Sequence, residues 1–164
     1  MAVIDDVITA VYRKDLPTLN SLRAAGADIN GTDEDGRTPL MHAVLDSDPD
    51  PRFIRHLLEQ GAFPDMADAN QRWTALHFAA QAQVANVVHL LVEAGAKVDA
   101  QDIFGNTPLW RAVMAPHPKT AVIDVLLRGG ADPSTRNAHG VSPHDVVRKR
   151  GLFDLQLQLE RKSS

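Results

Sequence analysis

The chain has 164 residues, enough for one domain with a hydrophobic core but too few for two of ordinary size. Hydrophobic residues make up 44% of it and charged residues 23%, as in soluble globular proteins, and no apolar run reaches the roughly 20 residues that span a membrane. The net charge of −4 argues against nucleic acid as a partner, and the absence of cysteine excludes disulfides and thiolate metal sites.

In chain order, the first predicted element is a pair of helices within residues 2–26. Similar phrases then open further helices, the last of them weaker: Thr38-Pro39-Leu40, Thr74-Ala75-Leu76, Thr107-Pro108-Leu109 and Ser142-Pro143-His144. These phrases are spaced by 36, 33 and 35 residues. A second marker, Gly-Ala, keeps the same period, with its glycines at Gly26, Gly61, Gly95 and Gly130. Two markers in step indicate a repeat array.

Each phrase has a physical role within its unit. The Thr hydroxyl caps free backbone N–H groups, and Pro fits the first helical position. A second apolar run follows at helical spacing, such as Val87, Val88 and Leu91, and Gly95 ends that helix. The stretch from Gly95 to Thr107 predicts an extended loop with a turn at its tip. Because one such unit cannot bury its apolar face alone, the pattern predicts a stack.

The intervals between the markers locate two kinds of insertion. The helix-opening Thr and the closing Gly are 21 residues apart in one unit but 23 in its two neighbours. The loops near 46–51 and 115–120 are therefore expected to be two residues longer, and their prolines exclude a continuous helix. The interval from Gly61 to Thr74 is 13 residues where the other three are 12, which places one inserted residue near Arg72.

The two ends of the array are expected to form capping units. In the first pair of helices, the residues expected to face inward are Val7, Ala10, Val11, Leu19 and Leu22. The closing pair has apolar Val146, Val147, Leu152, Leu155 and Leu159, with Arg148-Lys149-Arg150 and Arg161-Lys162 solvating its surface. The single domain, 1–164, then divides into an N-terminal capping repeat (1–30), three repeats (31–65, 66–99 and 100–134) and a C-terminal capping repeat (135–164).

These phrases resemble those of the ankyrin-repeat family. Thr74-Ala75-Leu76-His77-Phe78-Ala79-Ala80 is similar to its T-P-L-H-x-A-A opening, and residues 33–40 resemble the loop that leads into the next helix. The resemblance covers nearly the whole chain. It implies an all-α solenoid of helix-turn-helix units with projecting β-hairpin loops. It also implies that His77 links neighbouring repeats by hydrogen bonds, whereas Met41 and Trp110 replace that histidine in two other units.

No pattern of catalytic or metal-ligating residues emerges from the sequence. The other six histidines form no His-x-x-x-His pair, and no set of three or four ligands suggests a zinc site. Ser142, His144 and Asp145 have the side chains of a catalytic triad, but neighbours on one helix point in different directions. A helix cap is the better interpretation. No phosphate-binding glycine motif is present. We therefore expect no enzyme activity, no metal and no cofactor.

Three groups of residues are candidates for contact with a partner. Residues 1–82 carry 13 Asp and Glu against 7 Lys and Arg, and their acidic loops are either a solvated surface or a docking surface for a basic partner. Apolar residues near the hairpin tips either bind or pack against neighbours. The third group is a row on the inner helices that the resemblance implies. The candidates are Asp33, Glu34, Asp35, Arg37, His42, Asp46, Arg72, Trp73, Phe78, Gln81, Ile103, Phe104, Arg111 and Met114.

The function implied by the resemblance is non-catalytic protein binding through the hairpin tips and the concave helix face. One hypothesis is a bacterial immunity protein or antitoxin, which would cover a basic surface of a toxin in the cytoplasm. The alternative is a regulator of a kinase or transcription factor, or an effector directed at a host cell. The start of the chain lacks the pattern of a secretory signal, so the cytoplasm is the expected location. We expect a monomer that contacts neither nucleic acid nor a membrane.

Overall fold

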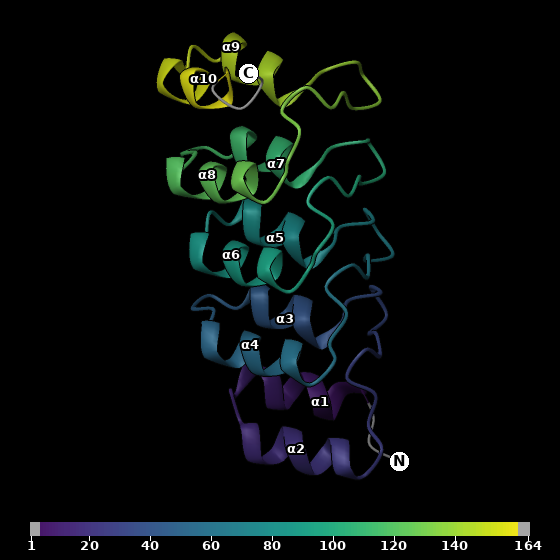
Figure 1. Cartoon of the computed structure of the whole chain (residues 1–164). Helices are drawn as coiled ribbons and strands as arrows, with labels where there is room; N and C mark the ends of the chain where they lie inside the picture. The colour runs from purple at the N-terminus through teal and green to yellow at the C-terminus, as the bar shows by residue number, and fades with distance from the viewer. Residues whose placement is uncertain (1–3, 161–164) are drawn as a thin grey trace.

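The structure is a computed structural model that describes residues 4–160, and the helices in that range form one continuous stack (Figure 1). Arg161 and Lys162, expected at the closing surface, lie outside the described residues. None of the helices between residues 4 and 160 is long and apolar enough to cross a membrane. The helices are α1 (Ile4–Tyr12), α2 (Leu16–Ala24), α3 (Pro39–Leu45), α4 (Pro51–Glu59), α5 (Ala75–Gln81), α6 (Ala85–Glu93), α7 (Pro108–Met114), α8 (Thr120–Arg128), α9 (Pro143–Lys149) and α10 (Phe153–Glu160).

The helices are arranged in two layers. The odd-numbered helices, which we call the first helices, pack in the order α1, α3, α5, α7 and α9. The second helices α4, α6, α8 and α10 form the other layer, and each first helix also packs against the second helix that follows it. The extended loops between pairs all project to one side of the stack (Figure 1). The main helix contacts are therefore within one unit or between units adjacent in sequence, as in a solenoid.

Side-chain caps start the first helices where the sequence predicted them. The hydroxyls of Thr38, Thr107 and Ser142 accept hydrogen bonds from the backbone N–H three residues later, and proline follows each of them. Thr74 has alanine in place of proline, and there His77 completes a capping box with the Thr74 backbone. The caps explain why helices of only seven residues have sharp starts.

The loops inside the units have the lengths that the marker intervals predicted. Residues 82–84 connect α5 to α6, whereas residues 46–50 and 115–119 connect the flanking pairs and are two residues longer. The longer loops hold the prolines that the helices cannot accommodate. Asp50 ends the first of them by accepting from Arg52 N, which caps α4.

The core repeats the same positions from unit to unit. Leu40, Leu76 and Leu109 are the second residues of their helices and are fully buried. The second helices α4, α6 and α8 each add at least three buried apolar residues, such as Val122, Ile123 and Leu126 in α8. In the capping units, the residues expected to face inward are buried, except that Leu22 and Leu152 are partly buried. Because these residues form one cluster through the stack, each unit depends on its neighbours for burial.

The projecting loops are tight turns rather than the regular β-hairpins that the resemblance implied. Among the residues that the structure describes, the only β-pairing outside the helices is an isolated bridge between Ala67 and Thr74. We call the four turns the finger loops: residues 33–37, 68–73, 102–106 and 137–141. Their geometry determines which side chains face solvent.

Candidate functional site

The finger loops are held in shape by the residue that opens each of them. Asp33 Oδ1 accepts from the backbone N–H groups of Asp35 (3.0 Å) and Arg37 (2.8 Å). Asp102 and Asn137 make the equivalent pair of hydrogen bonds in their own loops. A backbone hydrogen bond also closes each loop, for example Asp102 N to Asn106 O at 3.1 Å. The loop conformations therefore do not depend on a partner.

Neighbouring finger loops are also joined to one another. Backbone N–H groups donate across the gap from Ala69 to Asp35 O (2.9 Å), from Ile103 to Gln71 O (3.0 Å) and from Ala138 to Phe104 O (2.8 Å). Four loops far apart in sequence thus form one connected edge. Such an edge would lose little conformational entropy on binding.

The predicted insertion lies in the second finger loop. There the closing hydrogen bond joins Asp68 N to Trp73 O, five residues apart, whereas the other three loops close over four residues. Arg72 has φ of +57°, the left-handed conformation that glycine adopts just before the closing residue in the other loops. Trp73 closes this loop and directly precedes Thr74, as Arg37 closes the first loop and precedes Thr38.

Trp73 packs against its neighbours and does not project from the tip. Its ring stacks on His77 with centroids 6.2 Å apart and tilts against Phe78 at 5.0 Å. The Arg111 guanidinium carbon lies 4.4 Å from the centroid of the Trp73 ring. Of the two interpretations open for Trp73, the structure shows packing.

Arginines extend this cluster along the stack. Arg37 lies over the Phe78 ring at 5.9 Å, and Arg111 also lies over the Trp110 ring at 5.4 Å. We call Arg37, Phe78, Trp73, Arg111 and Trp110 the Arg–aromatic column. It crosses three units, so it couples them through side chains as well as through the core.

Arg111 is held by a buried carboxylate at the centre of the column. Its guanidinium pairs with Asp102, whose side chain is fully buried, and the Nε–Oδ2 distance is 3.1 Å. Burial alone would raise the pKa of Asp102, but hydrogen bonds from Arg111, Asn106 and Phe104 outweigh it and hold the pKa below its usual value. Asp102 is therefore charged at neutral pH, and Arg111 is its counter-ion.

His42 occupies the equivalent position two units earlier and is similarly engaged. Its Nε2 lies 2.8 Å from Asp33 Oδ2, and its Nδ1 lies 2.7 Å from the Tyr12 hydroxyl. His42 and Phe78 are both buried. Within the inner row predicted for contact, Met114 has 42% of its surface exposed, and Asp46, Gln81 and Arg111 are partly buried.

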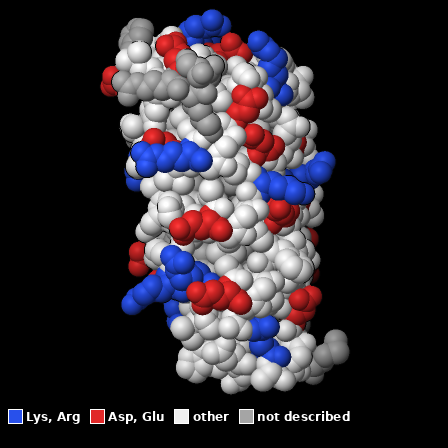
Figure 2. Space-filling view, in the orientation of Figure 1, with Lys and Arg blue, Asp and Glu red and all other residues white. Residues whose placement is uncertain are grey.

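Most of the predicted acidic group already has partners within the chain. Asp46 and Asp48 lie within 4.0 Å of Lys14 Nζ, and Asp35 pairs with Arg37 at 3.4 Å. Glu34 is exposed and makes no such contact with the residues that the structure describes. Figure 2 shows acidic and basic side chains interspersed over the displayed face, without a continuous stripe of either sign. The acidic group is thus largely neutralised by its neighbours.

The third finger loop differs from the others in having an apolar tip. Ile103 is 49% exposed and Phe104 is 45% exposed. The corresponding positions hold Glu34 and Asp35, Ala69 and Asn70, and Ala138 and His139. The backbone of the third loop is fixed on both sides, because Ile103 N donates to Gln71 O and Phe104 O accepts from Ala138 N. A rigid loop therefore presents two large apolar side chains to solvent, an arrangement typical of contact surfaces.

His77 makes the link between repeats that the resemblance implied. Its Nδ1 accepts from Thr74 N at 3.2 Å, so Nε2 carries the proton and donates to the Asn106 carbonyl at 3.1 Å in the next unit. Burial is the largest influence on this group and lowers the pKa of His77. The neutral imidazole is the form that the fold requires.

We expect His77→Met, which copies Met41 at the equivalent position, to lower the free energy of unfolding by about 1–3 kcal/mol at pH 7.5. The reason is that Asn106 O and Thr74 N each lose their hydrogen-bond partner. The pKa of His77 is lower in the folded chain than in the unfolded one. The contribution of His77 to the free energy of unfolding is therefore fully present above about pH 6.5 and falls as the pH drops below that value. Urea unfolding at pH 7.5 and 5.5 measures both effects. A cost of His77→Met that does not shrink at the lower pH would contradict this account.

Among residues 4–160, no group of three or more His, Asp or Glu side chains could hold a metal ion. Ser142 and Asp145 form a capping box, so the triad-like phrase is a helix start.

Comparisons with known proteins agree with this geometry. A family model described as ankyrin repeats (3 copies) matches residues 7–102 and 50–137. The chain belongs to the ankyrin-repeat family. It is 42% identical over 132 residues to ankyrin repeat domain-containing protein 63 of Homo sapiens, covering 78% of this chain and 32% of that protein. Ankyrin repeats are protein–protein interaction modules and are generally non-catalytic.

Two other relatives are proteins in which the matching region is only part of the length. The chain is 34% identical over 157 residues to B-cell lymphoma 3 protein of Homo sapiens, covering 93% of this chain and 35% of that protein. It is 36% identical over 119 residues to diacylglycerol kinase zeta of Rattus norvegicus, covering 71% of this chain and 12% of that protein. The chain thus spans about a third or less of the length of these relatives.

Proposed function

We propose that this ankyrin-repeat chain binds a partner protein through its finger tips and the adjoining ends of its first helices. The observation that carries the proposal is the apolar tip of the third finger loop, where Ile103 and Phe104 are half exposed on a backbone fixed from both sides. Met114, at the end of α7, adds a third exposed apolar side chain.

The energetics favour this surface over the charged residues of the same loops. Fully burying a large apolar side chain contributes about 1.5–3 kcal/mol, so two half-exposed ones supply a substantial anchor. Trp73 and Arg111 belong to residue types common at interface hot spots, but here they stabilise each other and the fold. We assign them to shaping the surface, and we assign the main contacts to the apolar tip.

The polar candidates surround this anchor. Glu34, Asp35, Arg37, Arg72 and Gln81 would set orientation and specificity at the rim, where charges act mainly on the association rate. Within this rim, the exposed Glu34 would suit a basic group on a partner, including a toxin, and the regulator hypothesis remains the alternative. Location in the cytoplasm and a monomeric state remain predictions.

The test is affinity capture of partners from cells that express the protein, with Ile103→Ser/Phe104→Ser compared with the native chain. Because both side chains are half exposed, the double variant should unfold at nearly the same urea concentration as the native chain. It should capture about tenfold less partner protein, or still less. Phe63→Ser is the matched control, since Phe63 is 62% exposed but lies outside the finger loops. Equal loss in control and double variant would refute the proposal.

A further inference from the structure

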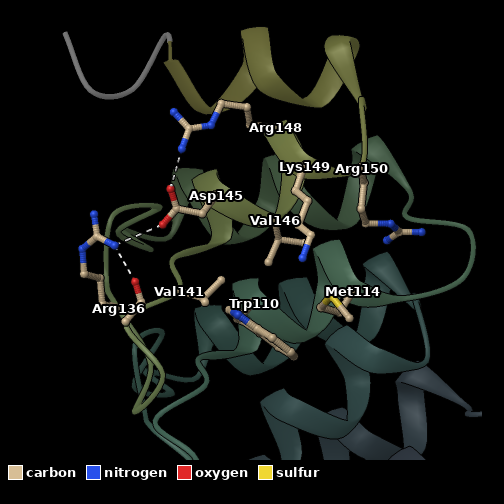
Figure 3. Close-up of a pocket in the computed structure, with 10 residues that line it drawn as sticks. Trp110, Met114, Arg136, Val141, Asp145, Val146, Arg148, Lys149 and Arg150 are labelled. Atoms are coloured by element: carbon tan, nitrogen blue, oxygen red, sulfur yellow. Dashed lines mark hydrogen bonds and ion pairs between the residues drawn. The ribbon is translucent and has the colours of Figure 1, made fainter.

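A hollow lies at the C-terminal end of the stack, between α7, α9 and the fourth finger loop (Figure 3). It is an open groove with a volume of about 1000 Å³, large enough for several side chains of a ligand. Trp110 and Met114 line it from α7, and Val141 and Val146 line it from the other side. Its floor is therefore apolar.

The rim of the groove is basic. Arg136, Arg148, Lys149 and Arg150 line it, and Asp145 is the only acidic residue among the lining residues. Asp145 already accepts from Arg136 Nη1 (3.2 Å) and Arg148 Nη2 (3.1 Å), so both its oxygens are engaged. The groove therefore carries an excess of positive charge, although the chain as a whole has a net charge of −4.

The three arginines of the rim are held by hydrogen bonds within the chain. Arg150 Nη1 donates to the carbonyls of Val113 and Ala115, the latter at 3.0 Å, which fixes its chain across the end of α7. Arg136 also donates to the Gly140 carbonyl. Among residues 4–160, the Lys149 ammonium group has no ion-pair or hydrogen-bond partner, and its side chain extends beside Val146 toward α7 (Figure 3). An ammonium group over an apolar floor is an open site for a carboxylate.

We propose that this groove binds an acidic peptide segment of a partner, with an apolar side chain on the floor and flanking carboxylates on Lys149 and the arginines. The proposal rests on the proposed function, because it treats the first-helix face as a protein-binding surface. Charge complementarity selects an acidic occupant, and the apolar floor selects a peptide over a nucleic acid, whose affinity would come from many phosphate contacts.

Fluorescence polarisation with short labelled peptides tests the proposal directly. One peptide has a Leu-Phe pair flanked by Glu on both sides, and two comparison peptides have the same pair flanked by Ser or by Lys. We expect the Glu-flanked peptide to bind about tenfold more tightly than the Ser-flanked one at low salt, and the Lys-flanked peptide not to bind. Equal binding of the three peptides would overturn the proposal.

Variants locate the site on the full chain. Lys149→Glu and Met114→Ser are each expected to weaken the Glu-flanked peptide about fivefold or more, because one reverses a rim charge and the other removes floor surface. Arg55→Glu makes the same charge change on an exposed residue of α4 and should leave binding unchanged. Binding that ignores both groove variants would overturn the assignment.

Other occupants give distinct results. A single-stranded oligonucleotide that displaces the peptide and binds more tightly would overturn the proposal in favour of nucleic acid. Dimerisation of the chain that Lys149→Glu abolishes would overturn it in favour of the acidic loop of a second copy. Ile103→Ser/Phe104→Ser should leave peptide binding unchanged, so failure of the groove and failure of the finger-tip surface are separable.

Discussion

Replacing Arg111 by methionine is expected to lower the free energy of unfolding by about 3 kcal/mol. The substitution leaves the fully buried Asp102 carboxylate without its counter-ion. Hydrogen bonds from Phe104 N and Asn106 N, both at 2.9 Å, remain and limit the loss. The guanidinium over the Trp73 ring is lost as well. Urea unfolding at neutral pH measures the total.

The control is Arg128→Met, which removes an arginine from an exposed pair with Asp124 at 2.8 Å. It should cost less than about 1 kcal/mol, because surface ion pairs contribute little. Adding Asp102→Asn to Arg111→Met should recover part of the loss, since the amide needs no counter-charge. If the two arginine variants lost the same stability, the buried pair of Arg111 and Asp102 would contribute no more than an exposed ion pair, and this account would be wrong.

The same pair predicts a dependence on pH. The pKa of Asp102 is lower in the folded chain, so its contribution to stability is present above about pH 4 and is lost as the pH falls through the folded value. The difference in unfolding free energy between the native chain and Arg111→Met should therefore narrow below about pH 4. If this difference in unfolding free energy widened on acidification, the inference that Asp102 is charged and paired with Arg111 would be contradicted.

Gly36→Ala is the second substitution expected to have a large effect. It should lower the free energy of unfolding by more than about 2 kcal/mol. Gly36 has φ of +74°, and a Cβ there would lie 2.6 Å from Ala69 N in the next finger loop. The left-handed conformation costs a non-glycine residue about 1–2 kcal/mol. The contact would also disturb the hydrogen bond from Ala69 N to Asp35 O.

The chain offers a matched control for this prediction. Gly140 occupies the same turn position with φ of +71°, but a Cβ there would meet nothing within 4 Å. Thermal or urea unfolding of Gly36→Ala and Gly140→Ala should differ by at least about 1 kcal/mol, with Gly36→Ala the less stable. Equal costs would mean that the close approach between finger loops contributes nothing beyond the backbone conformation.

Local rules sufficed to predict the helices and their spacing. Thr38, Thr107 and Ser142 cap helices because their hydroxyls reach N–H groups only three residues away. The loop lengths and the insertion near Arg72 followed from counting, since a solenoid repeats its contacts at the period of its sequence.

Exposure could not be predicted in the same way, because it depends on side chains from other units. His42 is buried partly by Tyr12, 30 residues earlier, and Trp73 is covered by Arg111 from the following unit. The buried pairs did leave a signal. Asp33 and His42, like Asp102 and Arg111, are separated by nine residues, a spacing that pairs each finger loop with its own first helix.

The groove was also hidden from sequence reasoning. Arg148-Lys149-Arg150 reads as a solvated run at the end of the array. In the structure, Arg150 reaches back to carbonyls 35 and 37 residues earlier, and Lys149 lies beside the apolar residues of the groove. Which side of a helix a charged run faces depends on the neighbouring helix, which local sequence does not encode.

Site-specific photo-crosslinking tests the central claim, that the finger tips contact a partner protein. A photoreactive phenylalanine analogue is placed at Phe104 in one protein and at Phe63 in another, both sites being well exposed. We predict that the analogue at Phe104 forms a covalent adduct with a single partner in cells, and that the analogue at Phe63 forms none. An adduct at Phe63 alone would place the binding surface elsewhere and contradict the account.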